Sequence, residues 1–388
     1  MIELSIKRLE NIQSENLLLK ISYSDIQTEA PLLVVLFDEC GINHTQNIYI
    51  TSKIQTFDYL SKLHRSVILV EDLEPLDEGD IVYFQSLAFS KLQLIYQVHS
   101  SHNVLFLTGE CNSMCKMCPQ PPKRDEIDYY SIALNTIAMV ETSPQFITIS
   151  GGEPTLLGDK LLEILDLIHN KWSKTESIQL LTNARLLANP SYTQRLIEVC
   201  KGGEKLTIGV PLHSDILAIH DDITQRKGSF AQTIRGLYNL SLYKNVCIEI
   251  RIVAQKANIS RLKDIIHFVG RYLTFVSHIS IMQMEPEGFA REHWGDFWID
   301  PTEYSKELVK AIDLAEMIGI PIKLYNYQQC ILPDSIRKYA YQSISDWKNI
   351  YQSNCKMCPS KENCAGFFKS QDNDKYYSKF ITPILKQI

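Results

Sequence analysis

Residues 103–122 read NVLFLTGECNSMCKMCPQPP, an apolar run followed directly by three cysteines in a C-x3-C-x2-C spacing. The apolar run is typical of a buried strand, so Cys111, Cys115 and Cys118 are expected on the loop that leaves its end. Three thiolates can hold three irons of a [4Fe–4S] cube and leave the fourth iron open to a small molecule. The same spacing also fits a zinc site whose fourth ligand comes from elsewhere, for example from His102.

A second motif ends the next apolar run, in residues 146–155, FITISGGEPT. Gly151 and Gly152 have no Cβ atom, so a ligand can approach the backbone closely there, and Pro154 fixes the turn. Backbone amide groups and Glu153 can then bond a cationic amino group. We therefore expect the cysteine loop and this turn to form one site at the ends of neighbouring strands.

Strand-length apolar runs alternate with helix-length segments through residues 99–325. The strand runs begin near residues 103, 146, 177, 205, 246 and 278. Six consecutive βα units predict a parallel sheet, and chemistry in such sheets collects at the C-terminal ends of the strands. Asn258 is expected to cap a helix over residues 259–273, and Asp300 precedes the first turn of another that begins at Pro301.

The regions on either side, residues 1–98 and 326–388, have different sequence patterns. Residues 1–98 contain short apolar runs separated by polar turns, which predicts a β-rich domain, either a partly closed barrel or a sandwich. An exposed edge of that sheet would offer a docking surface for a peptide strand, although the domain can equally be purely structural. Residues 326–388 hold four cysteines and little clean periodicity, so a bound cluster would explain how this segment keeps a fixed shape.

Together the cysteine loop and the GGEP turn resemble the radical S-adenosylmethionine (SAM) superfamily over roughly residues 103–325. The resemblance implies an α/β fold: a partial (β/α)6 barrel, here with an N-terminal β-rich domain and a C-terminal cysteine-rich extension. It also implies that the three cysteines bind a [4Fe–4S] cluster whose open iron is chelated by S-adenosylmethionine. The SAM-binding residues that it implies are Gly151, Gly152, Glu153, Pro154, Met117, Thr182, Asn183 and Arg251.

Several of these positions have alternative interpretations. Met117 stands where the family usually has an aromatic residue near the adenine, and a methionine can fill that space. Arg251 resembles an arginine that pairs with the methionine carboxylate, or it pairs with Glu249 on the same strand. Other polar candidates resemble family segments and can equally shape loops or face solvent: His213, Asp215, His220, Asp221, Glu285 and Glu287.

The second cysteine group consists of Cys330, Cys355, Cys358 and Cys364. Four thiolates can close a tetrahedral zinc site or fully ligate a [4Fe–4S] cluster, and thiolate chemistry alone does not separate the two. The C-x2-C-x5-C spacing resembles the SPASM and shorter twitch extensions of radical SAM maturases, which carry auxiliary clusters. A full SPASM set has more cysteines, so we expect one auxiliary [4Fe–4S] cluster, with zinc as the alternative.

A narrower resemblance is carried by CNSMCKMCPQPPK, SISDWKNIYQSNCKMC and CAGFFKS, which are similar to the HxsC radical enzymes of the His-Xaa-Ser system. It implies a maturase that modifies a peptide or protein with His-Xaa-Ser repeats. It also implies a second radical SAM enzyme or a small accessory protein as partner, and an external electron donor. The alternatives are a radical enzyme acting on a small molecule or nucleotide, and a metal-binding or redox-sensing protein without enzymatic activity.

Composition narrows the partners and the compartment. The 388 residues carry a net charge of −6, which argues against a nucleic-acid-binding surface. No run of 18 apolar residues is present, and the first residues contain no signal-peptide core, so the cytosol is the expected compartment. Cysteines in that compartment are seldom in disulfides. The isolated Cys40, Cys200 and Cys247 are therefore interpreted as small buried hydrophobic residues.

Overall fold

The computed structural model divides the chain into two compact units, which are described separately. It describes all residues except 1, 13–15, 37–43, 45, 86–90, 125, 202–204, 346–347 and 385–388. The first unit comprises residues 1–106, 128–147 and 167–175, and the second comprises residues 107–127, 148–166 and 176–388. The first unit therefore adds later segments to the N-terminal region, and the predicted boundaries at residues 98 and 325 stay predictions.

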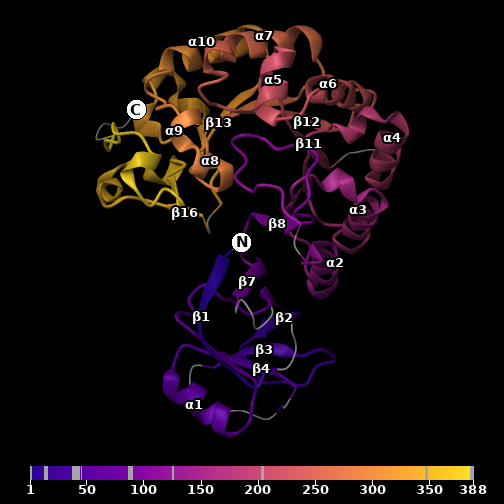
Figure 1. The fold of residues 1–388 in the computed structure, drawn as a ribbon, viewed down its shortest axis with the longest axis vertical. Helices are drawn as coiled ribbons and strands as arrows, with labels where there is room; N and C mark the ends of the chain where they lie inside the picture. Colours follow the sequence, from indigo (N-terminus) through magenta and orange to yellow (C-terminus); the bar gives the residue numbers. More distant parts are fainter. Residues whose placement is uncertain are drawn as a thin grey trace. The chain divides into compact units, whose positions relative to one another are not determined.

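The N-terminal strands of the first unit close into a barrel in the order β1-β5-β4-β3-β2-β6-β7 (Figure 1). Strands β2 to β5 pair in parallel and the other pairings are antiparallel. The strands are β1 (Ile2–Glu10), β2 (Asn16–Ser22), β3 (Leu32–Val35), β4 (Ile48–Thr51), β5 (Val67–Val70), β6 (Ile81–Gln85) and β7 (Lys91–Tyr96). The expected β-rich region is present, but the idea of peptide docking at a free sheet edge is wrong, because a closed ring of strands has no such edge.

Helix α1 (Ile54–Lys62) covers one outer side of this barrel and was not anticipated from the sequence. Its Phe57 and Leu60 are fully buried in a cluster with outward-facing residues of β3, β4 and β5. Because these three strands are covered on both faces, all of their residues are buried. By contrast β7 alternates buried and half-buried residues, as a strand with one covered face does.

The sheet that carries the cysteine loop has eight strands in the order β15-β14-β13-β12-β11-β10-β9-β8. From β10 to β15 every strand pairs in parallel with the next. The first six strands coincide with the six predicted runs: β8 (Asn103–Phe106), β9 (Phe146–Ser150), β10 (Ser177–Leu181), β11 (Leu206–Pro211), β12 (Cys247–Val253) and β13 (His278–Met282). The sheet then continues through β14 (Ile322–Tyr325) and β15 (Ala340–Tyr341), where the sequence analysis expected the βα rhythm to stop.

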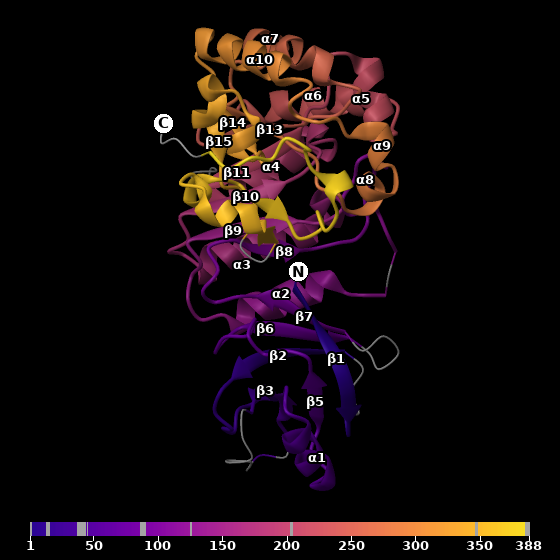
Figure 2. The same ribbon diagram turned by 90° about the vertical axis from the view of Figure 1, so that its left-hand side faces the viewer.

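Helices connect these strands and lie along the outer side of the curved sheet, as α4, α6, α7 and α10 do in Figures 1 and 2. The helices are α2 (Tyr129–Met139), α3 (Asp159–Lys171), α4 (Pro190–Val199), α5 (Leu217–Thr224), α6 (Ser229–Leu240), α7 (Leu262–Tyr272), α8 (Gly288–Glu292), α9 (Trp294–Phe297) and α10 (Ser305–Met317). In the described part of the chain no helix has the length and apolarity needed to cross a membrane.

Two predicted helix starts differ from the structure. Asn258 makes no capping bond; its amide instead donates to the carbonyl oxygens of His213 and Val253, so it ties two loops together. Asp300 accepts bonds from Thr302 in a turn that precedes α10. In both places the side chain bonds a nearby loop or turn, which is the usual competitor of a helix cap.

The C-terminal extension is built from short elements. Strands β16 (Asn349–Ile350) and β17 (Phe367–Phe368) form a small antiparallel sheet, and 3-10 helices span Gln329–Ile331, Asp334–Tyr339, Ser353–Met357, Lys361–Asn363 and Asp374–Tyr376. The extension, yellow in Figure 1, lies beside α8 and α9. There the Trp294 indole donates to the Lys375 carbonyl oxygen and the Arg291 guanidinium pairs with Asp372.

Candidate active site and second cysteine pocket

The first cysteine loop is held in place by backbone bonds to the end of α5. The amides of Met114 and Lys116 donate to the carbonyl oxygens of Thr224 and Ile223 over 3.1 and 3.0 Å. The Lys116 ammonium pairs with Asp222 at 2.8 Å. These contacts involve the residues between the cysteines, so they fix the loop without occupying a thiol.

Arg185 is a further anchor of the same loop, and the sequence analysis did not single it out. Its side chain is buried and donates to the Asn112 carbonyl oxygen and to the Ser113 hydroxyl, while its Nε donates to Gln232 at 2.7 Å. A charged residue in the apolar stretch LLTNARLL was the available signal, since buried arginines need several acceptors.

The two glycines of the GGEP turn allow its backbone to lie directly against the backbone of residues 108–110. A Cβ at Gly151 would stand 2.7 Å from the Thr108 carbonyl oxygen, and one at Gly152 would stand 2.3 Å from that of Glu110. The amide of Gly152 donates to Thr108, and the amide of Glu153 donates to Glu110. The amides of Gly152 and Glu153 are therefore used within the chain, where they seat the turn on the segment that leads into the cysteine loop. The S-adenosylmethionine contacts implied for Gly151, Gly152 and Glu153 stay predictions.

Glu153 lies at the centre of this junction and is fully buried. Its Oε1 accepts bonds from the Thr155 amide (3.0 Å), the Thr155 hydroxyl (2.6 Å) and the Thr182 hydroxyl (2.6 Å), and its Oε2 accepts from the Asn183 amide (2.7 Å). Burial raises the pKa of this carboxyl, and the four hydrogen bonds oppose that shift. Each carboxylate oxygen carries two lone pairs, and Oε2 accepts a single bond within the chain, so Oε2 keeps capacity for a further donor.

Thr182 and Asn183 also have partners within the chain. The Thr182 hydroxyl bonds Glu153, and the Asn183 amide group donates to Asn112 at 2.7 Å, next to Cys111. The Asn183 side-chain oxygen accepts from the Arg185 amide at 3.0 Å. The end of β10 is thereby joined to both motifs, and the ribose contacts implied by the resemblance stay predictions.

The three thiols of the loop lie close enough to influence one another. Burial raises the pKa of Cys115 to about 12 and that of Cys118 to about 11, and the charge of Cys111 adds to the shift in both. Burial likewise raises the pKa of Cys111. Such thiols stay protonated at neutral pH unless a metal replaces the proton, as metal-binding thiolates require.

Three thiols on one loop are a donor set that can ligate a [4Fe–4S] cluster. Among the described residues no three His, Cys, Asp or Glu side chains converge as ligands of one metal ion would. Each thiolate of a four-iron cube binds a different iron, so its ligands surround a volume and do not meet at a point.

Met117 is buried in an apolar cluster with Ile223, Met284, Trp294 and Tyr376, against which Cys115 also packs. The cluster brings together the cysteine loop, α5, α9 and the C-terminal extension. It keeps water from one side of the loop. The adenine contact implied for Met117 stays a prediction.

The turn after β13 contacts the cysteine loop, although the two segments are far apart in the sequence. Gly288 has a φ of 51°, and a Cβ there would stand 2.4 Å from Pro121 and 2.7 Å from the Cys118 carbonyl oxygen. The Phe289 amide donates to that same oxygen at 3.0 Å. Glycine is therefore required at this position, both for its left-handed backbone and for the close approach.

Arg251 pairs with Glu249 at 3.1 Å, which is the alternative that the sequence left open. Glu249 is buried and also accepts bonds from Gln179 (3.1 Å) and Ser280 (2.5 Å). These bonds and the Arg251 charge outweigh the effect of burial and hold the pKa of Glu249 below its usual value. A role of Arg251 toward the methionine carboxylate stays a prediction.

The polar residues after β11 shape loops. Asp221 accepts bonds from Gly228, Ser229 and Phe230 and so closes the loop before α6. Asp215 forms a two-bond pair with Arg261, at 2.8 and 2.6 Å.

His213 and His220 are buried neighbours of that loop, with ring centroids 5.6 Å apart. Burial lowers the pKa of His213 to about 3 and that of His220 to about 4. Both imidazoles are therefore neutral at physiological pH.

Glu285 and Glu287 share Lys348 of the extension as a partner, at 2.7 and 3.8 Å. Burial raises the pKa of Glu285 to about 7, although the Lys348 charge opposes the shift. Glu285 is thus not a solvent carboxylate, whereas Glu287 is partly exposed.

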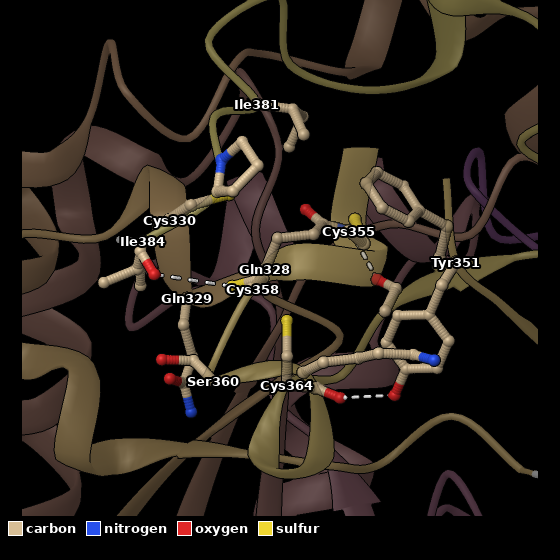
Figure 3. A pocket seen from close by; sticks show the side chains of 14 residues that line it. Gln328, Gln329, Cys330, Tyr351, Cys355, Cys358, Ser360, Cys364, Ile381 and Ile384 are labelled. Carbon is tan, nitrogen blue, oxygen red and sulfur yellow. Dashed lines mark hydrogen bonds between the residues drawn. The ribbon is translucent and has the colours of Figure 1, made fainter. Parts of the chain in front are cut away.

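The second cysteine group lines one pocket of the C-terminal extension (Figure 3). Cys330, Cys355, Cys358 and Cys364 all border it, together with Tyr351 and Phe367. Burial raises the pKa of Cys330 to about 11, and the charges of Cys364 and Cys355 add to that shift. The four thiols that the sequence analysis grouped thus line one pocket. In the described structure, no three of them converge on a point as the ligands of a single metal ion would.

Of the isolated cysteines, Cys200 and Cys247 lie in the described part of the chain and line neither site. Cys200 is buried, which raises the pKa of its thiol to about 12. Cys247 is partly buried and lies 4.0 Å from the His278 ring nitrogen. Cys40 lies outside the described residues.

Comparison with known proteins places this site in a family. The model of the Radical SAM superfamily matches residues 105–269, which include the cysteine loop and the GGEP turn. The antilisterial bacteriocin subtilosin biosynthesis protein AlbA of Bacillus subtilis (strain 168) is 23% identical over 305 residues. This alignment covers 74% of the chain and 61% of AlbA, so the chain spans less than two thirds of that relative.

Solved structures give more distant likenesses. SuiB of Streptococcus suis bound to S-adenosylmethionine has a TM-score of 0.45 and 13% identity, covering 58% of this chain and 50% of SuiB. A radical SAM methyltransferase from Sphaerobacter thermophilus has a TM-score of 0.45 and 10% identity, covering 65% of this chain and 74% of that one. By the family match and the relation to AlbA, residues 105–269 form a radical SAM superfamily domain, the class of enzyme that uses an iron–sulfur cluster and S-adenosylmethionine.

Proposed function

We propose that this protein is a radical SAM maturase that modifies a peptide or protein. With the cluster and S-adenosylmethionine bound, the cofactors supply a 5′-deoxyadenosyl radical that removes a hydrogen atom from a substrate carbon. Cys111, Cys115 and Cys118 hold the cluster in this proposal. The observation that carries it is the seating of the GGEP turn on the cysteine loop, where Gly152 and Glu153 bond the residues just before Cys111.

The chain's own residues position the reactants and exclude water. Glu153 is braced by Thr155, Thr182 and Asn183, so its free acceptor capacity has a fixed direction. Gly151 and Gly152 let the turn reach the loop, and Pro154 begins the short helix behind it. The apolar cluster around Met117 shields one side of the loop from solvent, which limits quenching of a reactive intermediate.

The second pocket is proposed to hold one auxiliary [4Fe–4S] cluster, with zinc as the alternative. Its four cysteines can ligate every iron of a cube, so no position is left open for a substrate. An electron-transfer or structural role follows from full ligation. The iron and zinc content of the purified protein distinguishes the two groups.

A peptide is the proposed substrate class because the relative AlbA is named for the biosynthesis of a bacteriocin. The sequence resemblance narrows this to a protein with His-Xaa-Ser repeats, and implies a second radical enzyme or accessory protein and an external electron donor. Because the chain spans 61% of AlbA, the substrate cannot be carried over from that protein. A small-molecule or nucleotide substrate is the alternative.

The test is co-expression of the enzyme with a His-Xaa-Ser protein followed by mass spectrometry of that protein. We expect a mass change that requires the enzyme and disappears with Cys115→Ala. S-Adenosylmethionine cleavage by the reduced enzyme is measured in parallel. Cleavage without any peptide change would favour the small-molecule alternative, and absence of cleavage by an iron-loaded protein would refute the enzymatic proposal.

A further inference from the structure

Residues 367–376 of the C-terminal extension run from the second cysteine pocket to the first cysteine loop. At one end of this segment, Phe367 lines the second pocket together with the four thiols. At the other end, Tyr376 is 4% exposed and belongs to the apolar cluster that contains Met117. The segment, which we call the connector, therefore reaches both cysteine sites.

Gln371 holds the connector in a compact turn. Its side chain is buried; its Oε1 accepts a bond from the Phe368 amide at 2.9 Å, and its Nε2 donates to the Tyr376 carbonyl oxygen at 2.8 Å. The Gln371 backbone amide donates to the Phe368 carbonyl oxygen at 2.9 Å. A buried side-chain amide whose donor and acceptor are both used makes the segments that it joins rigid. Gln371 thereby sets where Tyr376 lies relative to β17, the strand that borders the second pocket.

Helices α8 and α9 receive the far end of the connector. The Tyr376 ring meets the Trp294 indole edge to face, with ring centroids 5.4 Å apart, and the Arg291 guanidinium lies 4.5 Å from the centre of the Tyr376 ring. Arg291 also donates to the Ser370 carbonyl oxygen at 2.8 Å, and the Trp294 indole donates to the Lys375 carbonyl oxygen at 2.9 Å. These contacts hold the ring and the backbone on either side of it against the two helices.

The same two helices contact the first cysteine loop. The Phe289 amide at the start of α8 donates to the Cys118 carbonyl oxygen at 3.0 Å. On the apolar side, Met117 is buried in the cluster that includes Tyr376, and Cys115 packs against that cluster. The Tyr376 ring thus fills space beside a loop whose three thiols must keep a fixed spacing to ligate one cluster.

We propose that Tyr376 is a positioning residue for the first cysteine loop and that Gln371 holds Tyr376 in place. The proposal rests on the proposed function, because it takes this loop to bind the cluster that S-adenosylmethionine chelates. A close-packed interior transmits a displacement, since it has few voids to absorb one. Loss of a buried aromatic ring leaves a cavity into which its neighbours relax. Without the ring, Met117 and Cys115 shift, and the loop changes shape although its three ligands remain.

The experiment uses the full-length enzyme reconstituted anaerobically and measures its iron content and its Kd for S-adenosylmethionine. Tyr376→Ala removes the ring, and Tyr376→Phe keeps the ring that packs against Trp294. Ile336→Ala is the matched control, because Ile336 is 1% exposed in the extension but is not a member of the cluster that contains Met117. We expect the Kd to rise about fivefold in Tyr376→Ala and less than about twofold in the other two variants, with wild-type iron content in all three.

A spectroscopic measurement separates positioning from a general loss of stability. Chelation of an iron alters the electron paramagnetic resonance spectrum of a reduced cluster, so the spectrum reports the geometry of the ligands at that iron. With saturating S-adenosylmethionine, we expect an altered spectrum in Tyr376→Ala and the wild-type spectrum in Tyr376→Phe and Ile336→Ala. Gln371→Met loses both side-chain bonds but fills similar space, and it should raise the Kd about threefold. This milder variant decides the matter if Tyr376→Ala does not fold.

Three outcomes overturn the positioning proposal. One is the same Kd and the same spectrum in Tyr376→Ala and Ile336→Ala; another is a wild-type Kd in Gln371→Met. The third is a Kd in Tyr376→Phe as high as that in Tyr376→Ala, because packing of the ring would then not be the cause. An iron-loaded wild type that does not bind S-adenosylmethionine would instead overturn the proposed function, so the two failures are distinguishable.

Discussion

Replacing Glu153 by alanine removes the carboxylate that accepts hydrogen bonds from the GGEP turn and from the residues that follow β10. Thr155 would lose the acceptor for both its amide and its hydroxyl, and the Thr182 hydroxyl and Asn183 amide would lose theirs. These bonds are the internal partners of a carboxylate that is 1% exposed. We therefore expect Glu153→Ala to lower both the free energy of unfolding and the affinity for S-adenosylmethionine.

The magnitude follows from the four donors. A buried donor left without a partner costs about 1–3 kcal/mol, although a freed hydroxyl can turn toward another acceptor. Removing a buried carboxylate also returns the cost of its burial, which is the cause of its raised pKa. The net loss expected for Glu153→Ala is about 3 kcal/mol. Glu153→Gln keeps one oxygen but turns an NH₂ group toward a donor, so it should lose about 1–2 kcal/mol.

Urea unfolding of the anaerobic enzyme and titration with S-adenosylmethionine measure the two effects. Glu303→Ala is the matched control because this glutamate is exposed on the same domain. We expect affinity for S-adenosylmethionine to fall roughly tenfold or more in Glu153→Gln, with unchanged iron content. If Glu153→Ala unfolds and binds like Glu303→Ala, the junction does not depend on this carboxylate and the reasoning fails.

Three other predictions follow from the same structure. The reconstituted wild type should bind about eight irons, and replacing the three cysteines of the first loop by alanine should leave about four; four irons with one zinc in the wild type would refute the auxiliary cluster. Gly152→Ala should lower stability strongly and reduce iron loading of the first loop, because its Cβ would meet the Glu110 oxygen, whereas Gly295→Ala meets no atom within 4 Å and should be tolerated. Stability should fall as the pH falls from about 6.5 to 5, since the unfolded chain binds protons that buried His213, with its pKa of about 3, does not. Urea unfolding at both pH values should show that His213→Gln removes about 2 kcal/mol of this loss while His293→Gln removes none; equal losses would contradict the assignment.

Much of the fold was predictable because its signals are local. Six of the eight strands of the sheet were visible as apolar runs with helical segments between them, since side-chain periodicity depends only on neighbours in the chain. Strands β14 and β15 were missed: β15 has two residues, too few for any pattern, and β14 follows a helix inside a segment dominated by its cysteines. Helix α1 was missed because its buried positions, Phe57 and Leu60, lie in a short segment among strands.

Only the tertiary structure showed that the N-terminal strands close into a barrel. Its last strand, β7, pairs with its first, β1, and whether two such strands meet depends on the twist and tilt accumulated over the whole ring. The sequence therefore allowed both a closed barrel and a sheet with a free edge. The closed ring removes the peptide-docking mode that depended on an edge.

The sequence by itself singled out the residues that are proposed to carry the chemistry, because cysteine spacing and the GGEP turn are short patterns that can be recognised without the fold. The tertiary structure decided how those residues are used. The glycines allow contact between two backbones, and Glu153 braces the ends of β9 and β10. Arg185 anchors Ser113 of the cysteine loop, 72 residues earlier in the chain. The physical reason is that a hydrogen-bond partner is set by distance in space, and strands adjacent in the sheet are separated in sequence by entire helices.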